Sequence, residues 1–268
     1  MGIVIALGVL IGAIMGIIGA GGGILAVPVL VAGLHWSMQQ AAPVALVAVA
    51  AGAMVGALDG FKHRLVRYKA AILMAVCGVP MTHFGQQWAH ALPQYVLMGS
   101  FAALMMVVAR RFYQQAQQTA HTSDDVLVLA FISEATGKFI WTPLTALVLG
   151  GIGLFTGLMT GLLGVGGGFL IVPLMRRFTN LALPGIVATS LFLIFLVSTG
   201  GVVNAVRSGV VLPWFETSAF MVAMVSGMLT GRHLSRRLNA RQVQLGFSLL
   251  LLALSVYMMF KAWSHFNT

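Results

Sequence analysis

Two runs of three glycines are the feature of this sequence that most directly suggests a binding site. The runs occupy residues 21–23 and 166–168, inside apolar segments, and a Val-Pro pair follows each one. Three consecutive glycines disfavour a continuous helix, since each costs about 1 kcal/mol relative to alanine, and they let backbone approach a ligand closely. We therefore expect each run to interrupt a helix and the residues after it to begin a short new helix.

The start of a helix is a suitable place for an anion. Its first amides lack partners within the helix, and it carries about half a positive charge. Because non-helical backbone at membrane depth must be buried or line a polar cavity, two such breaks facing each other would form one central site. The expected substrate-binding backbone is that of Gly21, Gly22, Gly23, Ile24, Gly166, Gly167, Gly168 and Phe169. The alternative is that the glycines only allow tight helix packing.

A few polar side chains could assist this site. Thr189 and Ser190 could donate hydrogen bonds to an anion or, equally well, to a carbonyl of their own helix. Asp59 is the only acidic residue before position 110, and Asn204 occupies the equivalent place later in the chain. An intramembrane carboxylate at Asp59 would be a candidate for proton coupling, although the neighbouring Lys62 favours an interfacial ion pair. We include Asn204 in the expected substrate site.

Other chemistries lack the residues that they need. His and Cys do not recur with a carboxylate at metal-ligand spacing, and neither glycine run is followed by the Gly-Lys-Ser/Thr of a nucleotide-binding loop. The single cysteine, Cys77, cannot form an intrachain disulfide. The sequence thus predicts no metal, no cofactor and no enzymatic activity.

The composition is that of a membrane protein. Of 268 residues 59% are hydrophobic and 7% charged, with a mean hydropathy of +0.98, whereas soluble domains carry about 25% charged residues. Apolar stretches long enough to cross a bilayer recur, without the alternation of a β-barrel, so we expect an all-α polytopic fold in the cell (inner) membrane. The net charge of +10 does not indicate nucleic-acid binding, because the basic residues lie between the apolar spans. The first 20 residues lack the basic start of a cleavable signal peptide.

The chain contains an internal repeat. Residues 16–28 align with residues 161–173 at an offset of 145, and the same offset places Asp59 on Asn204. We divide the chain into a first transmembrane repeat (1–110), a polar cytoplasmic connector (111–142) and a second transmembrane repeat (143–268). Internal repeats of this kind are frequent in transporters.

The distribution of basic residues favours inverted halves. If each glycine break turns the chain back, each half contains a glycine-broken helix pair plus three transmembrane helices, and both termini lie outside. The cytoplasmic loops then hold Lys62, Arg64, Arg67, Lys69, Arg110, Arg111, Lys138, Arg176, Arg177, Arg232, Arg236, Arg237 and Arg241, against Arg207 and Lys261 outside. This split obeys the positive-inside rule better than four simple crossings per half, although an extra crossing in the connector would also invert the halves.

The doubled motif Gly-xx-Gly-x-Gly-Gly-Gly-xxx-Val-Pro, together with Ala188-Thr-Ser-Leu191 and Arg207-x-Gly209, resembles the sulfite exporter TauE/SafE family. The resemblance covers nearly the whole chain. It implies transport of sulfur-containing anions such as sulfite, sulfoacetate or thiosulfate. The first half has Pro43 and Val44 in the corresponding segment and no Thr-Ser pair, so hydroxyls would come from the second half alone.

From these observations we expect a secondary transporter that exports a small anion by alternating access around the two breaks. An anion channel with the same architecture, or a transporter of another small carboxylate or anion, is the alternative. The expected partners are the small anionic substrate and the lipid bilayer, and homo-oligomerisation is left open.

Overall fold

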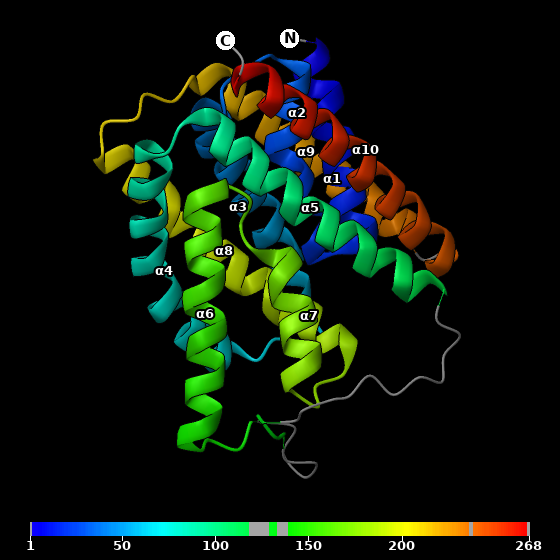
Figure 1. Cartoon of the computed structure of the whole chain (residues 1–268). Coiled ribbons are helices and arrows are strands. Elements are labelled where there is room, and N and C mark those ends of the chain that lie inside the picture. The colour runs from blue at the N-terminus through cyan, green and yellow to red at the C-terminus, as the bar shows by residue number, and fades with distance from the viewer. Residues whose placement is uncertain (1, 118–128, 133–138, 236–237, 267–268) are drawn as a thin grey trace.

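The computed structural model describes residues 2–117, 129–132, 139–235 and 238–266, and these are helical apart from loops and two isolated β-bridges (Figure 1). The first half contains α1 (Gly2–Ile18), the 3-10 helix η1 (Ala20–Leu25), α2 (Ala26–Gly33), α3 (Met38–Lys62), α4 (Tyr68–Ala91) and α5 (Gln94–Gln117). The second half contains α6 (Pro143–Leu163), α7 (Gly168–Phe178), α8 (Leu183–Arg207), α9 (Trp214–Ser235) and α10 (Ala240–Phe266). The prediction of an all-helical polytopic protein is confirmed.

Five of the described helices are long and apolar enough to cross a membrane: α3, α5, α6, α8 and the segment Arg241–Ser264 of α10. The remaining long helices, α4 and α9, have 24 and 22 residues. Helix α5 continues to Gln117, so the first residues of the expected connector are helical.

Local signals explain where several helices begin. Ser37 and Gln40 form a capping box at the start of α3, each side chain bonding the other's backbone amide. Thr142 caps α6 by accepting from the amide of Thr145, and Pro143 occupies the first turn, where its missing N–H costs nothing.

The two halves pack through equivalent helix pairs. The most extensive contacts are α1 with α9, α4 with α6, α5 with α10 and α3 with α8. The repeat relates α1 to α6 and α9 to α4, so the first two pairs correspond. A Cβ atom built on Gly12 would lie 2.0 Å from the carbonyl oxygen of Met224, and one on Gly157 would lie 2.1 Å from that of Gly78. Only glycine permits backbones to approach so closely.

Helices α3 and α8, which the repeat also relates, run antiparallel where they pack. A Cβ atom on Gly60, near the end of α3, would lie 2.8 Å from the Cβ of Ala188, near the start of α8. At the other end of the pair, a Cβ atom on Gly201 would lie 3.3 Å from Leu46. Residue numbers therefore rise along one helix as they fall along the other.

The chain turns back on itself after the first glycine run. A Cβ atom on Gly33, at the end of α2, would lie 2.5 Å from the side chain of Leu7 on α1. Helix α2 thus returns along α1, as a hairpin requires. Figure 1 shows that α1 begins and α10 ends at the same end of the molecule.

Candidate anion site between two helix breaks

The two glycine breaks lie against each other in the core. We call residues 19–25 the first break and residues 164–168 the second break. A Cβ atom on Gly168 would lie 2.2 Å from the carbonyl oxygen of Ala20, and one on Gly23 would lie 3.5 Å from that of Val165. All four residues are buried. The structure therefore places side by side the backbone segments that the sequence singled out in separate halves.

The second break is a non-helical turn that ends in an open helix start. Gly164, Gly166 and Gly167 adopt φ angles of 70°, 71° and 66°, a left-handed conformation that residues with a Cβ rarely take. Helix α7 then begins at Gly168, without a side-chain cap. The amides of Gly168 and Phe169, in its first turn, have no acceptor within the helix. Such a helix start can bind an anion.

The first break is built differently. Only Gly19 has a positive φ, of 86°, and the glycine run itself forms the 3-10 helix η1, which leads directly into α2. The amide of Gly22 donates to the carbonyl of Gly19 at 3.2 Å, and the amide of Ala26 donates to that of Gly23. Internal hydrogen bonds thus occupy backbone groups of the first break, although its residues, Ile24 included, are buried next to the second break.

The hydroxyls expected at the site have partners elsewhere. Thr189 Oγ1 accepts a hydrogen bond from the amide of Arg67 at 3.0 Å, in the loop between α3 and α4. Ser190 Oγ lies 4.0 Å from the sulfur of Met175 on α7. Both side chains are buried, and a role in substrate binding stays a prediction.

Ser198 on α8 is a candidate that the sequence analysis missed. Its side chain is fully buried, and its Oγ has no hydrogen-bond partner among the described residues. A Cβ atom on Gly166 would lie 3.0 Å from this oxygen, so the hydroxyl faces the second break. The available signal was its spacing of eight residues from Ser190, about two helical turns, which places both on similar faces of α8.

Asp59 pairs across the two halves. Its carboxylate forms an ion pair with Arg232 of α9, and His63 Nδ1 lies 3.4 Å from the same oxygen. The Asp59 and Arg232 side chains are each 39% exposed, which places the pair near the surface rather than in the buried site. This agrees with an interfacial ion pair, but with a partner from the other half rather than with Lys62.

The equivalent position, Asn204, belongs to a network of amide and imidazole side chains. Asn204 Nδ2 donates to Oε1 of Gln86, and Gln86 Nε2 donates to the carbonyl of Gly201 at 2.9 Å. Gln86 is the structural counterpart of Arg232, because its backbone contacts Gly161 as that of Arg232 contacts the equivalent Gly16. His83 Nδ1 lies 2.6 Å from Asn204 Oδ1, and Gln87 Nε2 lies 2.9 Å from His83 Nε2. One end of the molecule therefore joins the halves by a charged pair and the other end by amides.

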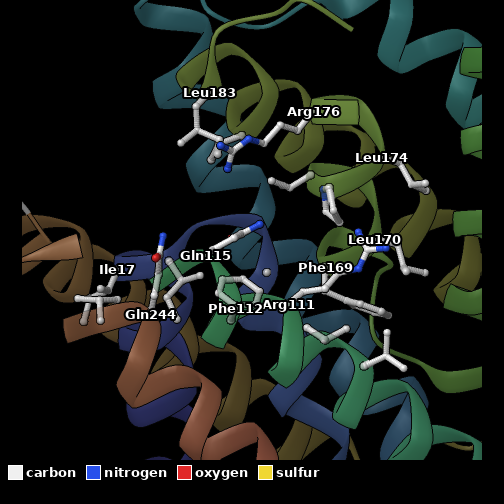
Figure 2. A pocket seen from close by; sticks show the side chains of 18 of the residues that line it. Ile17, Arg111, Phe112, Gln115, Phe169, Leu170, Leu174, Arg176, Leu183 and Gln244 are labelled. Atoms are coloured by element: carbon white, nitrogen blue, oxygen red, sulfur yellow. The ribbon is translucent and has the colours of Figure 1, made fainter. Parts of the chain in front are cut away.

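A cavity of about 510 Å³ leads to the breaks from the charged end (Figure 2). Arg111 and Gln115 of α5, Arg176 of α7 and Gln244 of α10 line it, with apolar side chains between them. It reaches Gly21 of the first break and Phe169 at the start of α7, and the described residues that line it include no carboxylate. The cavity therefore offers an anion a positively charged entrance to the second break.

A smaller cavity of about 70 Å³ lies at the other end, beside Asn204 and Gln86. Met38 and Ala42 line it, and the repeat relates these residues to Leu183 and Val187 of the larger cavity. The two cavities thus occupy equivalent places in the two halves but differ greatly in volume.

Apolar helices long enough to cross a bilayer, paired helix breaks in the core and a cavity toward each end define the class of protein as a multi-pass membrane transporter. The chain belongs to the sulfite exporter TauE/SafE family, whose match spans residues 4–258. It is 25% identical over 264 residues to a "probable membrane transporter protein" of Xylella fastidiosa (strain 9a5c), covering 96% of this chain and 94% of the relative. It is 24% identical over 267 residues to the "probable membrane transporter protein YunE" of Bacillus subtilis (strain 168), covering 97% of each. No solved structure matches the chain.

Proposed function

We propose that this protein is a secondary transporter that exports a small anion, sulfite or a related sulfur oxyanion or organosulfonate, across the inner membrane. The observation that carries the proposal is the start of α7 at the second break, which no side chain caps and whose first amides, at Gly168 and Phe169, have no acceptor within the helix. The family description supports sulfur oxyanions as the substrate class. The arginine-lined cavity supports export, because it would gather anions on the cytoplasmic side before they reach the break.

We further propose that the halves are inverted repeats with both termini outside. A two-fold axis in the membrane plane relates helices that run in opposite directions, and the antiparallel packing of α3 on α8 has this arrangement. The charges agree with it. Arg67 bonds Thr189 near the start of α8, at the end where Asp59 pairs with Arg232, whereas Arg207 terminates α8 at the opposite end.

The two cavities support alternating access. The larger cavity opens at the charged end, where Asp59 pairs with Arg232, and the smaller cavity lies at the other end. The buried breaks lie between them. Because the cavities occupy equivalent positions, exchanging the conformations of the two halves would close the larger cavity and open the smaller one. Because the buried breaks lie between the two cavities, this arrangement favours a transporter over an anion channel with the same architecture.

The test is anion flux into proteoliposomes that contain the purified protein. Sulfite, thiosulfate, sulfonates and carboxylates are compared for the wild type, for Gly167→Leu at the second break and for Gly99→Leu. Gly99 is the control, since no atom lies within 4 Å of a Cβ built there. We expect saturable flux of sulfur oxyanions that Gly167→Leu abolishes and Gly99→Leu retains. Flux that rises linearly with concentration would establish a channel, and normal flux in Gly167→Leu would refute the site.

A further inference from the structure

We propose that the second break binds the oxygens of the anion, and that the Ser198 hydroxyl is a donor that determines specificity for a head group with three oxygens. This inference rests on the proposed function. It makes the site asymmetric, although the repeat would have allowed two equal contributions.

The state of Ser198 is unusual for a hydroxyl in an apolar helix. Thr82, Thr156 and Thr160 are also buried, and each donates to the carbonyl four residues earlier, at 2.7–3.0 Å. This is the usual way of satisfying a hydroxyl in lipid. Ser198 instead leaves its oxygen without a partner among the described residues and directs it at Gly166. A buried hydroxyl in this state is available to a ligand.

The amides at the start of α7 are available in the same place. Helix α7 has 11 residues, its N-cap is the left-handed Gly167, and no side chain caps it. Its first amides, at Gly168 and Phe169, have no acceptor within the helix and follow directly after the turn that Ser198 faces at Gly166. The hydroxyl and the amides therefore come from two different helices and converge on one turn.

The first half lacks the hydroxyl. The position equivalent to Ser198 is Ala53, which has no donor, and it packs in the buried core. The amide of Gly22 is used within the first break, which continues as η1 into α2. The first amides of η1, at Ala20 and Gly21, likewise have no acceptor within their helix, so the Ser198 hydroxyl is the donor that distinguishes the second half.

The donor set favours one class of anion. Two amides, of Gly168 and Phe169, together with the Ser198 hydroxyl, match the several acceptor sites of a sulfite or sulfonate head group. A carboxylate has only two oxygens and leaves donors unpaired, and an unpaired buried donor is what makes a polar site reject a smaller analogue. Access comes from the 510 Å³ cavity, which Phe169 lines.

The experiment measures KM and maximal rate for sulfite and for formate in proteoliposomes, with Ser198→Ala, Ser198→Cys and a matched control. Ser248→Ala is the control, because Ser248 is also a buried hydroxyl but bonds within its own helix, to Leu245. Loss of a hydrogen bond to a charged group should raise the KM for sulfite at least about tenfold in Ser198→Ala. Ser198→Cys retains the size with a weaker donor, so its KM should also rise. Formate should be affected less, and Ser248→Ala not at all.

Thermal unfolding of each variant with and without sulfite separates binding from folding. We expect sulfite to raise the Tm of the wild type and of Ser248→Ala but not that of Ser198→Ala. An unchanged KM in both Ser198 variants, with sulfite transport intact in the wild type, would overturn this inference and leave the proposed function standing. The opposite failure, in which the folded wild type moves none of the anions, would refute the proposed function itself.

Discussion

At the scale of single residues, glycine serves two separate physical purposes in this chain. In the second break it allows positive φ angles, as at Gly166 and Gly167. Within α1 and α6 it allows helices to touch through their backbones, as at Gly12 and Gly157. The two purposes differ in what an added methyl group does: it strains the backbone in the first case and separates helices in the second.

The first prediction compares two glycines that the repeat relates, Gly166 and Gly21. Gly166→Ala should destabilise the protein by about 1–2 kcal/mol, because alanine disfavours a φ of 71° and its Cβ would lie 2.9 Å from Val49. Gly21→Ala should be tolerated, since its nearest atom would be 3.5 Å away and its φ is not positive. Thermal unfolding in detergent measures both. Equal effects would contradict the difference between the two breaks.

The sequence predicted the backbone of the candidate site better than its side chains. A glycine triplet is a local signal, and its duplication at a constant offset is enough to identify both breaks. The face of α8 that meets the second break has only a weaker signal, the spacing of Ser190 and Ser198, because a helix in lipid is apolar all round and hydrophobic periodicity does not orient it. Thr189 and Ser190 were therefore chosen from their position in a motif, whereas Ser198, the hydroxyl that faces Gly166, was missed.

At the scale of elements, the cross-half helix pairs depend on backbone contact. In the pair α4 with α6, Gly157 lies against the carbonyl of Gly78, and in the equivalent pair α1 with α9, Gly12 lies against that of Met224. Lipid provides no hydrophobic drive for helices to associate, so close packing through small residues has to stabilise these pairs.

The second prediction therefore concerns Gly157→Ala. The new Cβ would lie 2.1 Å from a backbone oxygen, which no rotamer change can relieve. We expect a loss of about 1–3 kcal/mol, typical of overpacking, seen as a lower Tm and a smaller monodisperse fraction in size-exclusion chromatography. Gly151→Ala in the same helix is the control, since nothing lies within 4 Å of its Cβ. A wild-type profile for Gly157→Ala would show that α4 and α6 can separate without cost.

The third prediction concerns the polar contacts that join the halves. Asp59→Asn with Arg232→Gln should reproduce at the charged end the neutral amide pair of Asn204 and Gln86. Since the ion pair is 39% exposed, we expect each single variant to lose no more than about 1 kcal/mol and the double variant to recover part of the loss. A double-mutant cycle of thermal unfolding measures this coupling.

Transport by the same variants tests the other role considered for Asp59. A structural pair predicts that the folded double variant still transports, because its counterpart at the other end functions without charge. Complete loss of proton-dependent transport in folded Asp59→Asn would instead make the carboxylate a coupling group.

The sequence predicted most elements but not the form of the first break. Long apolar spans and the repeat located the helices and both interruptions. They did not distinguish a 3-10 helix from a free helix start, because that choice depends on whether the break packs against its neighbour. In the structure, the carbonyl of Ala20 meets Gly168, so the two breaks share one contact surface, yet only the second contains several left-handed glycines.

At the scale of the whole molecule, a duplicated scaffold carries different charges at its two ends. The same pairs of positions hold Asp59 with Arg232 at one end and Asn204 with Gln86 at the other. The repeat explains why the geometry is shared. The charge difference fits a membrane, since basic residues are retained on the cytoplasmic side.

The last prediction tests the inversion with a single pair of equivalent residues. His63 follows α3 and Ser208 follows α8 at the repeat offset of 145, and both are exposed. In a Cys77→Ala background, single cysteines are placed at each position and treated in intact cells with a membrane-impermeant thiol reagent. If the halves are inverted, Ser208→Cys is labelled from outside, whereas His63→Cys is labelled only after the membrane is permeabilised. Parallel repeats would place the two positions on the same side, and they would then label together. The experiment needs no knowledge of the substrate, so its result bears on the architecture even if the transported anion proves to be a different one.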